Sequence, residues 1–124
     1  MKQYIHKKST DLVKLEAHIT RMNRGVVVAI GGGDSHIGTL ILAEPRTSLT
    51  GDGSISATSS VFNRIGHLDE APLRKNAEIL AATLNQPVVV TGGIHLERID
   101  KDSIVKIIDT CDLFFKEILQ ILGN

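Results

Sequence analysis

The sequence predicts an α+β domain in which a single, mainly antiparallel β-sheet carries two helices on one face. Two observations support this fold class. Up to about position 61, apolar residues alternate with polar ones or form short β-branched runs, which is typical of strands. Beyond position 70, apolar residues recur at helical spacing in two segments. The 124 residues contain no visible repeat or linker, so residues 1–124 are expected to form one domain.

Four strands are expected in the first half of the chain. Residues 12–21 alternate between apolar and polar, and Asn23-Arg24-Gly25 provides a turn into the β-branched run 26–30, so these segments predict a hairpin. Residues 37–43 and 55–61 are the next strands, separated by a long loop at 44–54. Residues 1–11 are expected to be a flexible or peripheral segment.

Two helices and one more strand are expected in the second half. Asp69-Glu70-Ala71-Pro72 opens a helix that Asn85 and Pro87 end. Residues 88–90 form a short buried strand. Asp100 or Asp102 caps a second helix that runs to about Leu122. The apolar stripe of this helix is broader than packing on one sheet requires, which indicates a homodimer.

The composition excludes several classes of protein. Fourteen basic residues balance fourteen acidic ones, and aromatic residues make up 3% of the chain, so we expect no nucleic-acid partner. We expect no membrane association, because the apolar runs fall far short of the roughly 20 residues of a spanning helix. Without a signal-like segment the protein is expected to be cytoplasmic. Cys111 on the apolar side of the second helix is interpreted as a buried structural thiol.

Three segments place glycine and histidine together after apolar runs, which indicates a binding site. They are Gly31-Gly32-Gly33-Asp34-Ser35-His36, Ile65-Gly66-His67 and Gly92-Gly93-Ile94-His95. Glycines allow backbone N–H groups to approach an anion such as phosphate or carboxylate. The first segment is not a nucleotide fingerprint, since His36 stands where the last glycine is needed, and it can also be a simple hairpin turn.

The three histidines of these segments allow two interpretations. His36, His67 and His95 can be drawn as a three-histidine metal site of a small enzyme, although no pair has the short spacing usual for ligands. Alternatively, each donates a hydrogen bond to a ligand oxygen or to a loop carbonyl. Acid–base roles for Asp34 beside His36, or for Asp69-Glu70 after His67, compete with simpler structural roles.

A row of hydroxyls is a further candidate. In a strand, Ser56, Thr58 and Ser60 share one face, where they suit phosphate, ribityl or carboxylate groups, although an edge strand facing water has the same pattern. Arg46 and Arg64 flank the row and are candidates for bidentate contacts to phosphate. The chain has no G-x-S-x-G elbow, so a hydrolase is disfavoured.

With these segments in order, the chain resembles the prenylated-flavin chaperone family, which includes the small D protein of the bacterial gallate decarboxylase system. The residues that carry the resemblance are 30–38, 56–61, 66–67 and 90–95. The resemblance implies an α+β fold similar to the small proteasome-assembly chaperones, usually dimeric. It also implies a non-catalytic accessory role beside decarboxylases that use prenylated FMN.

Carried onto this sequence, the resemblance gives a site for prenylated FMN or FMN made by the segments already singled out. The expected residues are Gly31, Gly32, Gly33, Asp34, His36, Ser56, Thr58, Ser60, His67, Gly92, Gly93 and His95. The chain departs from the family where Ile65 stands in place of an expected proline, which bears on the rigidity of that loop. Few aromatic residues are available to stack on a flavin, and Phe62 is the one near a glycine segment.

The leading hypothesis is therefore a protein that binds prenylated FMN and delivers it to, or protects it for, a decarboxylase. The alternative is a protein–protein assembly chaperone that acts through the apolar face of the second helix. A three-histidine metal enzyme is the third possibility.

Overall fold

The computed structural model describes residues 1–64, 70–95 and 100–123. Its elements follow the chain as β1 (Lys2–Ser9), β2 (Lys14–Met22), β3 (Gly25–Gly32), β4 (Thr39–Thr47), β5 (Ile55–Asn63), α1 (Glu70–Leu84), β6 (Val88–Ile94) and α2 (Lys101–Leu122). The α+β class and the two helices agree with the prediction.

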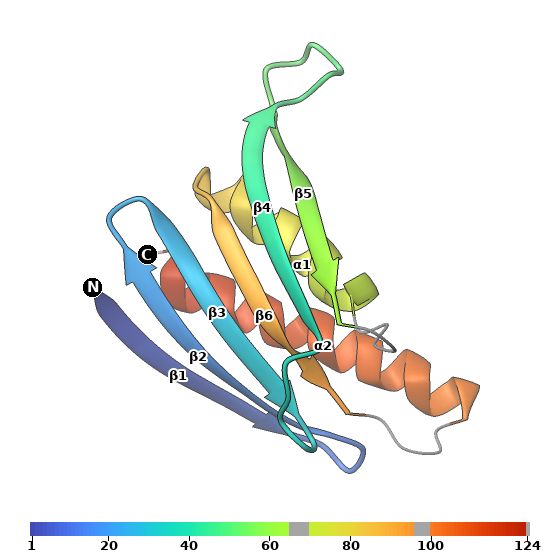
Figure 1. Cartoon of the computed structure of the whole chain (residues 1–124). Coiled ribbons are helices and arrows are strands. Elements are labelled where there is room, and N and C mark those ends of the chain that lie inside the picture. The colour runs from blue at the N-terminus through green and yellow to red at the C-terminus, as the bar shows by residue number, and fades with distance from the viewer. Residues whose placement is uncertain (65–69, 96–99, 124) are drawn as a thin grey trace.

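The six strands form one open sheet in the order β1-β2-β3-β6-β4-β5 (Figure 1). All neighbouring strands are antiparallel except the central pair, in which β3 and β6 are parallel. The predicted hairpin is present, since Met22 pairs with Gly25 across the turn between β2 and β3. The sheet is therefore mainly antiparallel, as expected.

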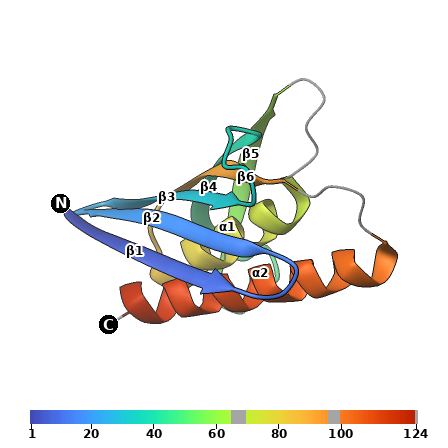
Figure 2. The same cartoon turned by 90° about the horizontal axis from the view of Figure 1, so that it is seen from below.

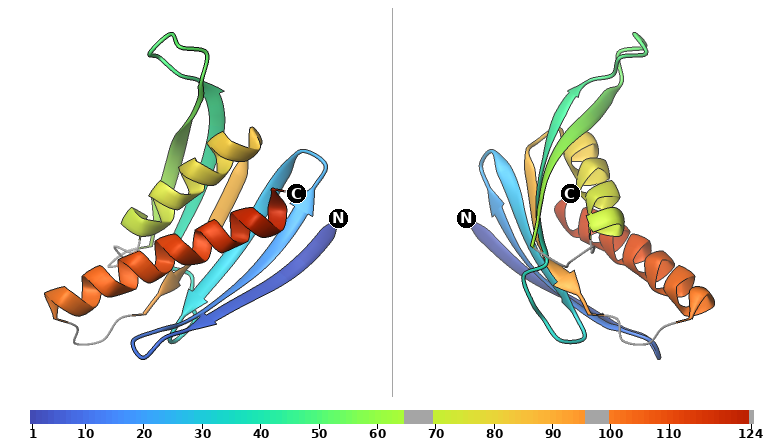
Figure 3. Two further views of the ribbon diagram at one scale, coloured as in Figure 1. Left: turned by 180° about the vertical axis from the view of Figure 1, so that it is seen from behind. Right: turned by 45° about the vertical axis from the view of Figure 1, so that its right-hand side comes forward.

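Both helices cover the same face of the sheet (Figures 2 and 3). Because paired residues share a face, alternate residues of β2, β3, β4 and β6 point toward the helices and are fully buried there. Ile19, Val28, Ile41 and Val90 are 0–1% exposed. The apolar side of α2 completes this hydrophobic core with Ile107, Cys111, Phe114, Phe115, Ile118 and Leu122.

Three segments differ from the sequence prediction. The short strand expected at 88–90 is the seven-residue β6, which continues through Gly92 and Gly93 to Ile94. Residues 1–11 were expected to be flexible or peripheral, but Lys2–Ser9 forms β1, an edge strand paired with β2 along its whole length. The third strand was expected to end at Ala43, but β4 continues to Thr47 through Pro45. Beyond Ala43, β4 pairs only with β5, so Pro45 occupies an edge-like position in which a missing N–H is tolerated.

The helix ends agree with the sequence signals. Asp100 caps α2, and its side chain accepts a hydrogen bond from the backbone N–H of Ser103. Asn85 follows α1 in a left-handed conformation with φ of 53°, a conformation that asparagine tolerates. Over the described ranges, neither helix has the length and apolarity needed to cross a membrane.

A charged cluster fastens the edge strand β1 to α2. Glu117 of α2 accepts hydrogen bonds from His6 Nε2 at 2.9 Å and from Lys8 Nζ at 3.1 Å. The imidazole of His6 also stacks on Phe114, with 4.8 Å between ring centroids. Hydrogen bonds from His6 and then Lys8 lower the pKa of Glu117 below its ordinary value. The carboxylate form of Glu117 therefore favours the folded state.

This cluster predicts a pH-dependent contribution to stability. Because the pKa of Glu117 is lower in the folded state than in the unfolded state, its carboxylate stabilises the folded protein at pH values above the unfolded pKa. This stabilisation is lost as the pH falls through the folded-state pKa. The variant Glu117→Gln is therefore expected to be less stable than the parent at pH 6 by about 1 kcal/mol or less, because the group is partly exposed. Urea unfolding from pH 7 to pH 3 should show the two proteins converging at low pH. A constant difference across this range would contradict the role assigned to Glu117.

Candidate functional site: a hollow on the open face of the sheet

The face of the sheet opposite the helices is not covered by any helix or strand of the described residues (Figure 3). We call it the open face. Every second residue of each strand points to the open face, and residues that pair across neighbouring strands point to the same face. These paired residues form rows that run across the sheet. One row across the sheet is Ile5, His18, Ala29, Thr91, Leu40 and Phe62, and the next is Gln3, Thr20, Val27, Val89, Leu42 and Ser60.

A hollow of about 340 Å³ lies at one end of this face, where β3 and β6 end. Its lining includes Glu16 and His18 of β2, Ala29 to Gly31 of β3, Ser35 to Ile37 of the following loop, and Thr91 and Gly92 of β6. The volume falls within the roughly 300–1,000 Å³ of small-molecule sites. Ala29 has only a methyl side chain, so the central strand offers a flat floor there, while Ser35 of the following loop lies over Gly31.

The glycines allow the loop after β3 to fold against the strand ends. A Cβ at Gly31 would lie 2.5 Å from Ser35 Oγ, so only glycine allows Ser35 to approach the floor this closely. Gly33 has φ of +68°, and a Cβ there would lie 3.0 Å from the carbonyl oxygen of His95. The backbone N–H of His95 also donates to the carbonyl of Gly32 at 2.8 Å. The first and third glycine–histidine segments therefore pack directly on each other.

Two histidines meet at this end of the sheet. The rings of His36 and His95 lie edge to face with 6.2 Å between centroids. His36 Nδ1 is 2.9 Å from the backbone carbonyl of Asp34, and because a carbonyl only accepts, His36 donates from Nδ1. This contact holds the ring beside the hollow, on the loop that the three glycines begin.

A carboxylate and a third imidazole form the opposite rim. Glu16 contacts Lys7 Nζ at 3.1 Å and His18 Nε2 at 3.2 Å. The hydrogen bond from Lys7 and, to a smaller extent, that from His18 lower the pKa of Glu16. The hollow therefore has an ionised hydrogen-bond acceptor on β2 and the glycine-rich loop on its other side.

The structure brings together seven of the predicted site residues and separates others. Gly31, Gly32, Gly33, His36, Gly92, Gly93 and His95 gather at the hollow end of β3 and β6. Asp34 joins them through its backbone carbonyl, and its side chain is exposed. His67, with Ile65 and Gly66, lies outside the described residues.

The row of hydroxyls lies elsewhere on the open face. Ser56, Thr58 and Ser60 do share one face of β5, where they pair with Arg46, Glu44 and Leu42. Three strand spacings of about 4.8 Å separate β5 from β3, so the row is on the order of 14 Å from the floor. Ser60 is the hydroxyl nearest to the hollow, because its register position is closest to that of Thr91.

The two flanking arginines lie at opposite ends of the sheet. Arg46 donates to Thr58 Oγ1 at 2.7 Å, far from the hollow. Arg64 donates to the carbonyl of Ile37, and its backbone N–H donates to Gly38. Arg64 is therefore attached to the loop that borders the hollow.

Sequence reasoning did not find Glu16 and His18 as site residues. Both stand on the polar side of an alternating strand, which is also the pattern of an ordinary solvent-facing surface. Only the pairing of Glu16 with Gly31 and of His18 with Ala29 places them beside the glycines. The order of the strands carries this information, and local patterning does not.

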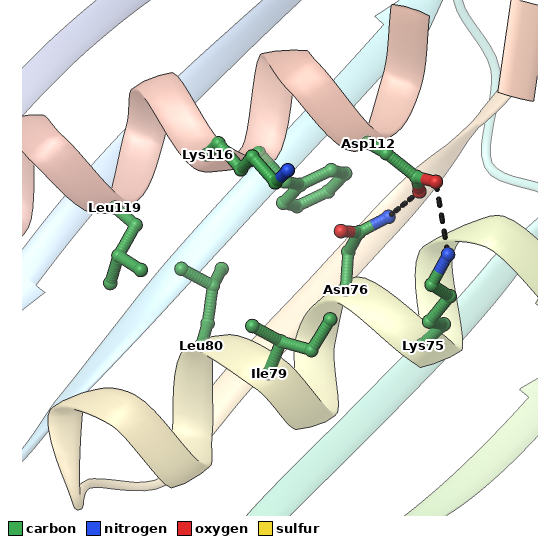
Figure 4. A pocket seen from close by; sticks show the side chains of 8 residues that line it. Lys75, Asn76, Ile79, Leu80, Asp112, Lys116 and Leu119 are labelled. Carbon is green, nitrogen blue, oxygen red and sulfur yellow. Dashed lines mark hydrogen bonds and ion pairs between the residues drawn. The ribbon is translucent and has the colours of Figure 1, made fainter. Parts of the chain in front are cut away.

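A second hollow of about 260 Å³ lies between the two helices (Figure 4). Asp112 of α2 accepts hydrogen bonds there from Lys75 Nζ and from Asn76 Nδ2, both at 2.9 Å. Burial raises the pKa of Asp112, but the two hydrogen bonds together with the positive charges of Lys75 and Lys116 outweigh it, so the pKa is lowered. Among the described residues, none of those predicted from the glycine–histidine segments lines this groove. The three polar groups satisfy one another across the helix pair.

The three-histidine metal site and the structural role predicted for Cys111 can both be compared with the geometry. No group of three histidine, cysteine or acidic side chains within the described ranges is arranged to hold a metal ion, and His67 of the proposed triad falls outside those ranges. Cys111 is buried, and desolvation raises the pKa of its thiol to about 12. The thiol stays protonated at neutral pH, which agrees with the structural role predicted for it.

Comparison with known proteins gives a fold relative and a family. One solved structure, a chaperone complex for yeast 20S proteasome assembly, contains a chain that matches with a TM-score of 0.52 at 16% identity, covering 98% of this chain and 94% of that one. At this identity the match shows a shared fold. Comparison with curated proteins gives no match. The family model of the prenylated flavin chaperone LpdD-like domain matches residues 9–123. The chain therefore belongs to the prenylated flavin chaperone LpdD-like family.

Proposed function

We propose that this protein binds prenylated FMN in the hollow on the open face and serves as a non-catalytic accessory of a decarboxylase that uses this cofactor. Membership of a prenylated flavin chaperone family supports the ligand class. The observation that supports this position is the flat floor at Ala29, bordered by a carboxylate and by the glycine-rich loop whose Ser35 lies over Gly31. A cytoplasmic location is part of this proposal.

The two rims of the hollow suit the two ends of a flavin nucleotide. An isoalloxazine ring is planar and carries an N–H donor on its pyrimidine edge, which Glu16 would accept while the ring lies on the floor. The phosphate would lie away from this carboxylate, at the loop of Gly31–Gly33 with His36 and Arg64 nearby. Gly92, Gly93 and His95 would support that loop from β6. Ser60 would be the first hydroxyl available to a ribityl chain that extends across the sheet.

Substitution at the floor tests this assignment. The added methyl group of Gly31→Ala would displace Ser35, which lines the hollow, so we expect the affinity of this variant for reduced prenylated FMN to fall at least about tenfold, or 1.4 kcal/mol. Anaerobic titration followed by absorbance measures this, with reduced FMN as the second ligand. The matched control is Gly53→Ala, in a distant loop where no atom lies within 4 Å of the added Cβ.

The titrations distinguish a protein that binds no flavin from one that binds flavin outside the hollow. Wild-type protein that is folded but binds neither flavin contradicts the proposed function. Equal affinities of Gly31→Ala and Gly53→Ala contradict the hollow as the site. The accessory role predicts in addition that loaded protein activates a cofactor-free decarboxylase faster than free prenylated FMN at the same concentration.

A further inference from the structure

The hollow between α1 and α2, which we call the helix groove, is a concave site separate from the one on the open face. Its apolar lining consists of Ile79 and Leu80 of α1 and Phe115 and Leu119 of α2. Its volume of about 260 Å³ is roughly nine times the 30 Å³ that a water molecule occupies in the liquid. A molecule of on the order of ten non-hydrogen atoms therefore fits the helix groove, whereas a flavin nucleotide is too large for it.

Asn76 is a buried polar residue in the helix groove. It is 4% exposed and lies one turn before Leu80, on the core side of α1. Its amide nitrogen donates to the carbonyl of Pro72 at 2.8 Å and to Asp112 Oδ1 at 2.9 Å. A backbone carbonyl and a carboxylate can only accept hydrogen bonds, so these two contacts fix the orientation of the amide.

The oxygen of the same amide has no hydrogen-bond donor among the described residues. Figure 4 shows this oxygen turned away from Asp112, toward the side of the groove that Leu80 and Leu119 form. Buried polar atoms in folded proteins are nearly always satisfied, and this one can be satisfied only by a donor from outside the described chain. The helix groove is therefore open to a ligand that brings an O–H or N–H group.

Lys116 supplies an unpaired positive charge at the rim of the helix groove. Its exposed side chain lines the groove and makes no ion pair or hydrogen bond with any described residue. The other ammonium, that of Lys75, lies 2.9 Å from Asp112 Oδ2. The pKa of Asp112 is lowered, so its carboxylate is ionised at neutral pH and balances Lys75. The charged residues of the groove therefore leave one positive charge uncompensated.

We propose that the helix groove binds a small hydroxylated monocarboxylate with an aliphatic body. The hydroxyl would donate to Asn76 Oδ1, the carboxylate would pair with the ammonium of Lys116, and the aliphatic body would pack on the apolar lining. The helix groove shares no lining residue with the hollow on the open face. This inference therefore goes beyond the proposed function and does not rest on it.

The charge of the helix groove decides between ligand classes. A phosphate monoester carries about −1.5 to −2 charges at pH 7, whereas the groove has one unpaired ammonium with the carboxylate of Asp112 beside it. No arginine is found in its described lining. A carboxylate brings the single negative charge that Lys116 can pair. A hydroxyl suits Asn76 better than an amine does, because an ammonium would add to the positive charge of the groove.

The test uses flavin-free wild-type protein and 6-hydroxyhexanoate, in which a flexible aliphatic chain joins one hydroxyl to one carboxylate. We expect saturable changes in the backbone amide NMR spectrum, largest at Asn76, Leu80 and Phe115, with a dissociation constant of about 1 mM or below. Hexanoate lacks the hydroxyl and should bind at least about tenfold more weakly, because the buried oxygen of Asn76 stays unpaired. The diol 1,6-hexanediol lacks the charge and should bind about fivefold more weakly.

A lysine substitution locates the charge that the ligand meets. Lys116→Gln removes the positive charge and keeps a side chain of similar length, so it should bind 6-hydroxyhexanoate and 1,6-hexanediol about equally well. Lys106→Gln is the matched control, since Lys106 is an exposed lysine of the same helix that does not line the groove. It should keep the preference of the wild-type protein for the carboxylate. Circular dichroism confirms that both variants are folded.

Several results would overturn the proposal. They are the absence of saturable shifts up to about ten times the expected dissociation constant, equal binding of hexanoate and 6-hydroxyhexanoate, and an unchanged preference in Lys116→Gln. Largest shifts at Ala29 and Gly31 would move the ligand to the open face and overturn it as well. The three ligands are compared on wild-type protein, so the test does not depend on a variant folding. Because no flavin is present, failure here is distinguishable from failure of the proposed function.

Discussion

The variant Gly92→Ala is expected to lose most of the stability of the fold. Gly92 lies inside the central strand β6 with φ of +126°, where it pairs with Ile30 of β3 and Thr39 of β4. A Cβ at this position would overlap the backbone carbonyl oxygen of Ile30, which cannot move without breaking the ladder. We expect a loss of at least about 4 kcal/mol, beyond the usual effect of one substitution. Urea unfolding followed by circular dichroism measures it.

The control for this prediction is the same substitution in open space. Gly53 also has a positive φ, of 79°, but nothing lies within 4 Å of an added Cβ. Gly53→Ala should therefore lower the free energy of unfolding by only about 1 kcal/mol, the cost of holding alanine in a left-handed backbone conformation. If the free energies of unfolding of the two variants, measured with urea, differ by less than about 1 kcal/mol, the packing described around Gly92 is wrong.

The second large effect is expected for Phe114→Ala in α2. Phe114 is fully buried, packs edge to face on Phe115 with 6.3 Å between ring centroids, and supports the ring of His6. Its removal takes away one of the contacts that join α2 to the core and to the edge strand β1. We expect unfolding to be easier by about 3–5 kcal/mol, the usual cost of deleting a buried aromatic ring.

Its neighbour Leu113 provides the comparison. Leu113 is 47% exposed on the same helix, so Leu113→Ala keeps the helical propensity and should change stability by less than about 1 kcal/mol. Similar losses for the two alanine variants in the same urea experiment would mean that α2 does not dock as described.

Sequence patterning predicted most of the fold because burial in this protein is strongly periodic. The alternation in β2, the β-branched runs of β3 and β6 and the capping residue Asp100 each act within a few residues. Strand β1 was missed because its residues are half-buried or exposed: it lies at the sheet edge and carries lysines, as edge strands commonly do.

The candidate site was predictable only in part, for a related reason. The glycine–histidine segments at 31–36 and 92–95 could be grouped because each follows an apolar run, and the parallel pairing of β3 and β6 brings their ends together. Glu16 and His18 could not be found, because their position depends on which strand pairs with β3. The hydroxyl row of β5 was grouped with the glycines by residue type, whereas the strand order separates them by two intervening strands.

The central claim is that a flavin binds on the open face at the end of β3 and β6. The most direct test is a backbone amide NMR titration of the labelled protein with reduced prenylated FMN under anaerobic conditions. The account predicts saturable shifts that are largest at Ala29, Gly31, Ser35 and Thr91. Saturable binding whose largest shifts fall instead at the helix groove, around Asn76, Leu80 and Phe115, would contradict it, as would the absence of any shift.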